Sequence, residues 1–262
     1  MSAGRVLFYV FTLALTATAV LVALLGATFA PVLLCALVAY LAVILVGVLV
    51  PQLAMFAPVL VRLDTTATDI ALTFDDGPHP VSTREVLAVL ERFGAKATFF
   101  VLGEKVRAAP DVLREIVAAG HAVGIHGDWH DRMFSFRHPA RIVADIERAR
   151  DAVATVTGQR PTLLRPPLGH ISPRTALAAR RLGLTLVGWS VRGRDGLAGA
   201  TSAAVERRVA SGLRPGAIVL LHDAAERGDR VPAGVAALPA ILAEASRLGL
   251  RPIPLEVSRV TS

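Results

Sequence analysis

Two adjacent carboxylates, Asp75 and Asp76, follow the mainly apolar run 70–74 and stand directly before a Gly-Pro pair. Neighbouring negative charges repel each other, and burying either one is costly unless a cation lies close to it. A tight Asp-Gly-Pro turn would account for the pair without any site. The pair therefore leaves two alternatives open, a turn that ends a strand and a site that holds a cation.

Two histidines, His126 and His130, follow another apolar run and are four residues apart. At that spacing the two imidazoles fall on one face of a helical turn, which is how paired histidines chelate a single metal ion. Taken alone, such a pair is more often structural than metal-binding. We expect the neighbouring His121 to be a structural histidine within a strand.

Two further ionisable side chains stand where apolar runs end. Arg165 begins an Arg-Pro-Pro-x-Gly loop, where it can hold a carboxylate while the rigid loop fixes the direction of a backbone N–H. The alternative is a solvated surface arginine. His222 ends the run 217–221 and needs a partner to set its tautomer and pKa, for which Asp195 is the candidate. We expect the adjacent Asp223 to be a helix or turn cap.

Short apolar runs alternate with longer amphipathic ones, which favours an α/β fold with a parallel sheet, open or closed into a barrel. The predicted strands are 70–74, 97–102, 122–125, 162–164, 184–189 and 217–221. The predicted helices are 82–93, 110–119, 140–156, 173–182, 203–213 and 234–248. In such barrels functional groups gather at the C-terminal ends of the strands, and the polar clusters follow predicted strands.

The order of these motifs resembles the polysaccharide deacetylase family, which shares the NodB homology domain (carbohydrate esterase family 4 type). The matching motifs are Thr-Phe-Asp-Asp-Gly-Pro, His-x-x-x-His, Arg-Pro-Pro-x-Gly, the Asp195 loop and Leu-Leu-His. The segment 97–103 also resembles the second strand of that family, and the similarity extends from residue 70 to about residue 254. It implies a distorted (β/α) barrel with one divalent metal ion, most often Zn²⁺ and alternatively Co²⁺, at its C-terminal face.

The resemblance also implies roles for the matching residues. Asp75 would be the general base, oriented by Arg165. His222 would be the general acid, tuned by Asp195. The metal ligands would be Asp76, His126 and His130.

Substrate-facing positions both match and depart from the family. The backbone N–H of Leu168 would help to hold the oxyanion, and Leu220 would line the pocket for the acetyl methyl group. Gly127 stands where the family usually has Ser or Thr, and Leu168 stands where an aromatic side chain is common. In the fourth motif, Arg192 and Gly196 replace an Asp and a Trp. We therefore expect a different substrate subsite around an intact set of ligands, base and acid.

The first part of the chain predicts a membrane anchor. Residues 6–61 have no charged side chain, and this segment is long enough for two membrane spans. We place the spans at about 6–28 and 32–50. A cleavable signal peptide is the alternative, although its apolar region would be much shorter. Arg5 and Arg62 place both ends in the cytoplasm by the positive-inside rule, whereas the family is mostly extracytoplasmic. We therefore predict an integral membrane protein and favour an extracytoplasmic catalytic domain, while the sequence leaves both topologies open.

Composition limits the remaining possibilities. The net charge is +7, yet no Lys/Arg run with interleaved aromatic residues indicates nucleic-acid binding. Cys35 is the single cysteine, so neither a disulfide nor a cysteine metal site forms within one chain. We divide the chain into an anchor, 1–61, and a deacetylase domain, 64–262, and expect a monomer that contacts a lipid bilayer.

The leading hypothesis is a metal-dependent hydrolase that removes an N-acetyl, or an O-acetyl, group from amino sugars of a glycan such as peptidoglycan or a chitin-like polymer. A deacylase or deformylase of a lipid-linked sugar is the alternative within the family. A non-catalytic sugar-binding protein is the alternative outside enzymes.

Overall fold

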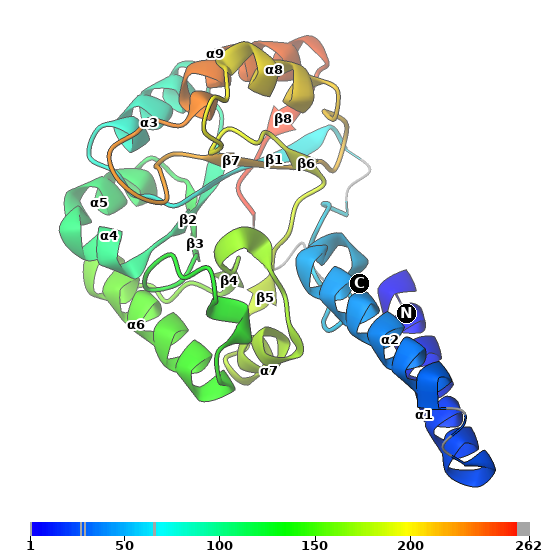
Figure 1. Ribbon diagram of the computed structural model, residues 1–262. Helices are drawn as coiled ribbons and strands as arrows, with labels where there is room; N and C mark the ends of the chain where they lie inside the picture. The colour runs from blue at the N-terminus through cyan, green and yellow to red at the C-terminus, as the bar shows by residue number, and fades with distance from the viewer. Residues whose placement is uncertain (1, 27, 29, 65–66, 256–262) are drawn as a thin grey trace.

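The computed structural model describes residues 2–26, 28, 30–64 and 67–255. Two long helices, α1 (Ala3–Leu25) and α2 (Ala30–Leu49), project together from the rest of the molecule (Figure 1). By length and composition both could cross a membrane. The helices begin and end one to three residues earlier than the predicted spans, because Ser2 caps the first turn of α1 and Gly26 ends it. Most of their apolar side chains are exposed, which is typical of helices that face lipid.

The remainder forms a curled parallel sheet covered by helices, as expected for a distorted (β/α) barrel (Figure 1). The strand order is β5-β4-β3-β2-β1-β7-β6, with β8 beside the start of β1, and every strand pair is parallel. The strands are β1 (Asp69–Asp75), β2 (Ala97–Val101), β3 (Ala122–Ile125), β4 (Leu163–Leu164), β5 (Thr185–Leu186), β6 (Val191–Arg192), β7 (Ile218–His222) and β8 (Arg251–Pro252).

Helices alternate with these strands, close to the predicted positions. They are α3 (Ser82–Arg92), α4 (Gly103–Ala108), α5 (Pro110–Ala118), α6 (Pro139–Thr157), α7 (Pro173–Arg181), α8 (Ser202–Ala210) and α9 (Ala233–Arg247), with short 3₁₀ turns at Pro51–Leu53, Phe134–Phe136 and Pro167–Gly169. The short α4 was not predicted. Its six residues are too few to show a helical period.

The predicted strand 184–189 is wrong over its second half. β5 ends at Leu186, and a separate short strand, β6, pairs with β7. The cause is a contact with a residue distant in sequence, because the carbonyls of Val187 and Gly188 accept hydrogen bonds from the guanidinium of Arg165. This backbone therefore binds a side chain where the prediction expected a longer strand.

Strand β1 is buried in the core, between β2 and β7. All seven residues of β1 are buried, and Phe74 stacks on Phe99 of β2 with ring centroids 5.2 Å apart. The parallel register pairs Asp75 with Phe100 on one side and with His222 on the other. Consequently the last residues of β1 and β7, Asp75 and His222, lie at one level, and the last residue of β2 is one position further along.

Candidate metal centre and active site

Asp76, His126 and His130 converge at the C-terminal ends of β1 and β3. The Nε2 atoms of His126 and His130 lie 3.4 Å and 3.6 Å from the same atom, Oδ1 of Asp76. The candidate ligand atoms all lie within 4.8 Å of one another, and all three residues are buried. Within the part of the chain that the structure describes, this Oδ1 is buried without a hydrogen-bond donor. A shared cation would satisfy it, so two nitrogens and one oxygen fit a zinc site of the catalytic type.

The tautomer of His126 is set by the backbone. Its Nδ1 lies 2.7 Å from the carbonyl oxygen of Arg165, and since a carbonyl can only accept, Nδ1 carries the proton. The lone pair of Nε2 then points toward Asp76, as in metal sites where a backbone carbonyl orients the ligand. In the metal-free chain, burial opposes ionisation of Asp76, but the nearby imidazole of His126, when it is protonated on both nitrogens, outweighs burial and lowers the pKa of Asp76 below its ordinary value.

Two residues that sequence reasoning missed hold the backbone around these ligands. Nζ of Lys105 on α4 donates to the carbonyls of Asp76 and Ala225, each at 2.7 Å. Oδ1 of Asp145 on α6 accepts a 2.8 Å hydrogen bond from the N–H of Asp128. Asp145 is fully buried among apolar residues of its helix, and burial raises its pKa. A carboxylate within the apolar stripe of the predicted helix 140–156 was the signal that could have revealed it.

Gly127 has a conformational reason to depart from the Ser or Thr of the family. Its φ is +107°, and a Cβ there would lie 3.2 Å from the carbonyl oxygen of Trp129 and 3.4 Å from Oδ1 of Asp145. L-residues rarely adopt such a backbone. The loop between the two histidines is thus held from α6, through Asp145, instead of by a hydroxyl at position 127.

Asp75 is paired with a buried cation. Nη1 of Arg165 donates to Oδ1 of Asp75 at 2.7 Å and to Oγ1 of Thr73 at 2.8 Å. Nη2 donates to the carbonyl of Gly188 at 2.7 Å, and the guanidinium lies 4.2 Å from the ring centroid of Phe100. Burial lowers the pKa of Arg165, which the charge and hydrogen bond of Asp75 oppose. Every arm of the guanidinium is engaged, so it fixes the orientation of Asp75.

His222 is held by a second carboxylate. Its Nδ1 lies 2.9 Å from Oδ1 of Asp195, and its backbone N–H donates to Oδ2 at 2.8 Å. Asp195 is fully buried, and Gly234 packs against it so closely that a Cβ there would lie 2.3 Å from Oδ2. Burial opposes protonation of His222, but the hydrogen bond and charge of Asp195 raise the pKa of His222 to about 9. The imidazole therefore holds a proton at neutral pH in the metal-free chain.

These groups open into one cavity of about 130 Å³. Seven of the nine site residues that the sequence indicates line it: Asp75, Asp76, His126, His130, Leu168, Leu220 and His222. The other two, Arg165 and Asp195, lie behind the lining and contact Asp75 and His222. All nine predicted residues therefore belong to one constellation.

The cavity wall contains the positions that depart from the family. Leu168 is exposed and has φ +60°, and Leu220 is almost fully buried on β7. Arg192 lies with its guanidinium 5.4 Å from the ring centroid of Trp189, which also lines the cavity. A Cβ at Gly196 would lie 3.4 Å from Cε1 of His222, so position 196 leaves the imidazole uncovered.

Two ionisable residues outside the cavity, His121 and Asp223, accept hydrogen bonds that stabilise the fold. His121 accepts a hydrogen bond from the N–H of Ala97, and burial lowers its pKa to about 4, as expected of a neutral structural histidine. Asp223 is fully buried and accepts a 2.5 Å hydrogen bond from Oγ1 of Thr83 on α3, and burial raises its pKa to about 7. This hydrogen bond joins the loop after β7 to α3 and differs from the local cap that we expected.

Comparisons with known proteins point to one family. A family model described as polysaccharide deacetylase matches residues 62–187, which include the three candidate ligands. A peptidoglycan-N-acetylglucosamine deacetylase of Listeria monocytogenes is 38% identical over 154 residues, which cover 59% of this chain and 32% of that protein. The chain thus spans about a third of that relative. A chitooligosaccharide deacetylase of Sinorhizobium fredii is 38% identical over 164 residues, covering 62% of this chain and 75% of that protein.

The fold is shared with solved deacetylase structures. The crystal structure of a peptidoglycan N-acetylglucosamine deacetylase aligns with a TM-score of 0.71 at 27% identity, covering 77% of this chain and 92% of that one. Asp195 and His222 lie beyond the residues matched by the family model, and the tertiary structure brings them beside the matched ones.

Proposed function

The chain belongs to the polysaccharide deacetylase family, and we propose that it is a metal-dependent hydrolase that releases acetate from an N-acetylated amino sugar of a glycan. The observation that carries this proposal is the placement of Asp75 and His222. They are register partners on neighbouring parallel strands, and both line the cavity that holds the metal-ligand cluster. A base and an acid beside one open metal site are what hydrolysis of an amide requires.

Each side chain has a role in this proposal. Asp75, oriented by Arg165, takes the proton of the attacking water as the water oxygen bonds to the acetyl carbon. His222, charged through its contact with Asp195, gives its proton to the sugar nitrogen as the carbon–nitrogen bond breaks. Acetate and the free amine are the products.

The oxyanion and the methyl group also have candidate positions. The backbone N–H of Leu168 would stabilise the oxyanion, and Leu220 would contact the acetyl methyl group. A divalent ion held by Asp76, His126 and His130, Zn²⁺ or alternatively Co²⁺, would supply Lewis-acid stabilisation of the developing negative charge.

Within the family, the charge around the cavity favours an acidic sugar. Arg192 and Arg194 both line the cavity, and among the described residues neither forms an ion pair with a carboxylate. Two unpaired guanidinium groups beside the cleavage site attract an anionic substituent. We therefore favour peptidoglycan, whose muramic acid carries a lactyl group that ends in a carboxylate where the stem peptide is absent, over a neutral chitin-like polymer.

The two apolar helices support a membrane-anchored enzyme. We propose that α1 and α2 span the bilayer as a hairpin and hold the catalytic domain close to its outer surface. The same arrangement favours a second candidate, deacylation or deformylation of a lipid-linked sugar. A reporter fused at the C-terminus, active only outside or only inside the cell, determines which side carries the domain.

The activity is tested with the full chain purified in detergent. After chelation and restoration with Zn²⁺, we expect release of acetate from muramic-acid-containing oligomers, and slower release from chitooligosaccharides. An Arg192→Gln/Arg194→Gln variant should raise KM for the acidic substrate alone. Acetate release that survives chelation or Asp75→Asn would contradict the mechanism. Glycan binding without turnover by the zinc-loaded chain would favour a non-catalytic sugar-binding protein.

A further inference from the structure

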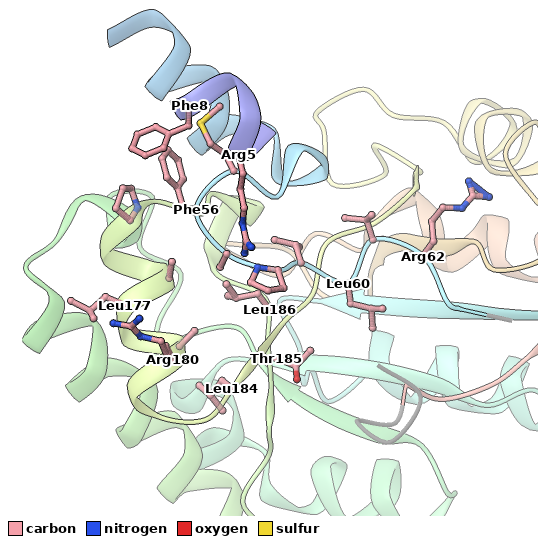
Figure 2. Close-up of a pocket in the computed structure, with 18 of the residues that line it drawn as sticks. Arg5, Phe8, Phe56, Leu60, Arg62, Leu177, Arg180, Leu184, Thr185 and Leu186 are labelled. Carbon is pink, nitrogen blue, oxygen red and sulfur yellow. The ribbon is translucent and has the colours of Figure 1, made fainter. Parts of the chain in front are cut away.

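A large groove lies where the helix hairpin meets the catalytic domain (Figure 2). It has a volume of about 1230 Å³ and is lined by the first turns of α1, by the segment 55–64, and by α7 and β5. It shares no lining residue with the catalytic cavity. Its walls are mainly apolar, and the largest apolar side chains are Phe8, Phe56, Leu60, Leu177, Leu184 and Leu186.

Three arginines surround these apolar walls. Arg5 extends from α1 toward Leu186, Arg180 lies on α7, and Arg62 lies at the other end of the groove (Figure 2). Within the described ranges none of the three guanidinium groups is in an ion pair with a carboxylate. Asp64 is the one acidic residue among those that line the groove. The groove therefore offers positive charge beside apolar surface, which suits an anionic amphiphile.

The position of the groove indicates where that amphiphile comes from. α1 begins and α2 ends beside it, so a hairpin that spans the bilayer places the groove at the level of the lipid headgroups. Aromatic residues gather at the same level, since Phe8 lies 5.6 Å from Tyr9 and 5.9 Å from Phe56 between ring centroids. Aromatic and basic side chains together are typical of the membrane–water interface.

We propose that this groove binds an anionic glycerophospholipid, with its phosphate beside Arg5 and Arg180 and an acyl chain along Phe8, Phe56 and Leu177. The bound lipid would join the hairpin to α7 and so fix the orientation of the catalytic domain above the bilayer. This inference rests on the proposed membrane insertion of α1 and α2, and it is independent of the proposed deacetylase activity.

The test measures lipid binding to the full chain in detergent by native mass spectrometry. Dioleoyl-phosphatidylglycerol and dioleoyl-phosphatidylcholine have the same acyl chains, so their difference isolates the headgroup charge. We expect tighter binding of phosphatidylglycerol and a loss of roughly 10- to 30-fold in its affinity in Arg5→Gln/Arg180→Gln, since each basic residue near an anionic headgroup contributes about a five-fold effect. The matched control, Arg181→Gln/Arg207→Gln, removes the same charge from exposed positions outside the groove and should bind like the unaltered chain.

Two further experiments test whether the ligand needs an acyl chain and whether the helices insert into a bilayer. An Ala176→Trp variant fills the apolar wall and should reduce binding of both lipids, whereas glycerol phosphate, which has no acyl chain, should not compete. Equal binding of both lipids, equal loss in the control variant, or competition by glycerol phosphate would each overturn the proposal. Failure of the chain to insert into phosphatidylcholine nanodiscs would overturn it through its premise, and acetate release measured on the same sample keeps that outcome separate from a failure of the catalytic proposal.

Discussion

Asp75 accepts a 2.7 Å hydrogen bond from Arg165, whose side chain has no exposed surface. The neighbouring carboxylate, Asp76, instead faces His126 and His130 with a buried oxygen that has no donor among the described residues. Two adjacent residues of the same type therefore have different counter-charges. The repulsion expected between them is relieved because each carboxylate has its own cationic partner or cation site.

This difference predicts that the two carboxylates fail in different ways. Asp76→Ala should lose the metal, whereas Asp75→Ala should retain it and lose turnover by about 10²- to 10⁴-fold, the usual contribution of a general base. Zinc content measured by atomic emission, together with acetate release, distinguishes the two variants. If both variants lose zinc, or both retain it, the assignment of base and ligand is wrong.

The buried guanidinium predicts a large effect of a conservative change. Arg165→Lys keeps a positive charge but cannot reach Asp75, Thr73 and the carbonyl of Gly188 together. We expect turnover to fall sharply while zinc is retained. Arg165→Ala leaves Asp75 unpaired in the interior and should lower the free energy of unfolding by about 3–5 kcal/mol. Urea titration and zinc analysis of both variants check this, and an active Arg165→Lys enzyme would contradict it.

The raised pKa of His222 predicts a pH-dependent stability. His222 has a folded-state pKa of about 9 against an ordinary value of 6.5, so the folded chain binds a proton that the unfolded chain releases between these values. The stabilisation is complete below pH 6.5 and disappears as the pH rises through about 9. Urea unfolding of the metal-free chain between pH 6 and 10 should show this fall.

Asp195→Asn is the matched variant for that measurement. Since Asp195 supplies the hydrogen bond and the charge that raise the pKa, its neutral replacement should flatten the profile across this window. The same variant should lower kcat while leaving zinc content unchanged. An unaltered slope in Asp195→Asn would show that another group is responsible.

The backbone at Gly127 predicts that restoring the usual residue of the family is harmful here. Gly127→Ser would place a side chain on a residue with φ +107° and crowd the carbonyl of Trp129. The strain should cost about 1–2 kcal/mol, displace the loop between His126 and His130, and weaken zinc binding. Gly196→Ala is the control, because its Cβ would make an ordinary contact with His222. Competition with a chromogenic chelator measures both affinities, and tighter zinc binding by Gly127→Ser would refute the strain argument.

Predictions from local sequence patterns were confirmed where the interactions that decide the structure are also local. Apolar spacing, glycines after helices and prolines at first turns located the long helices within a few residues, because capping and periodicity act over one or two turns. The prediction of a strand over the second half of 184–189 was wrong because the backbone there accepts hydrogen bonds from Arg165, a residue distant in sequence. Lys105 and Asp145 were missed for the same reason, since their partners lie in loops that follow other strands.

The sequence by itself determined the order of the motifs, and with it the family, the ligand types and the apolar helices, since all of these are properties of residue type and spacing. The resemblance implied that Arg165 orients Asp75 and that Asp195 tunes His222, but only the tertiary structure established these contacts. The parallel register placed Asp75 beside His222, and the curl of the sheet brought Arg165 within hydrogen-bond distance of Asp75. The packing of the hairpin against the domain placed Arg5 and Arg180 in the lining of one groove. Those contacts depend on long-range packing and chain closure, whose free energy is shared among many residues and is not encoded in any short segment.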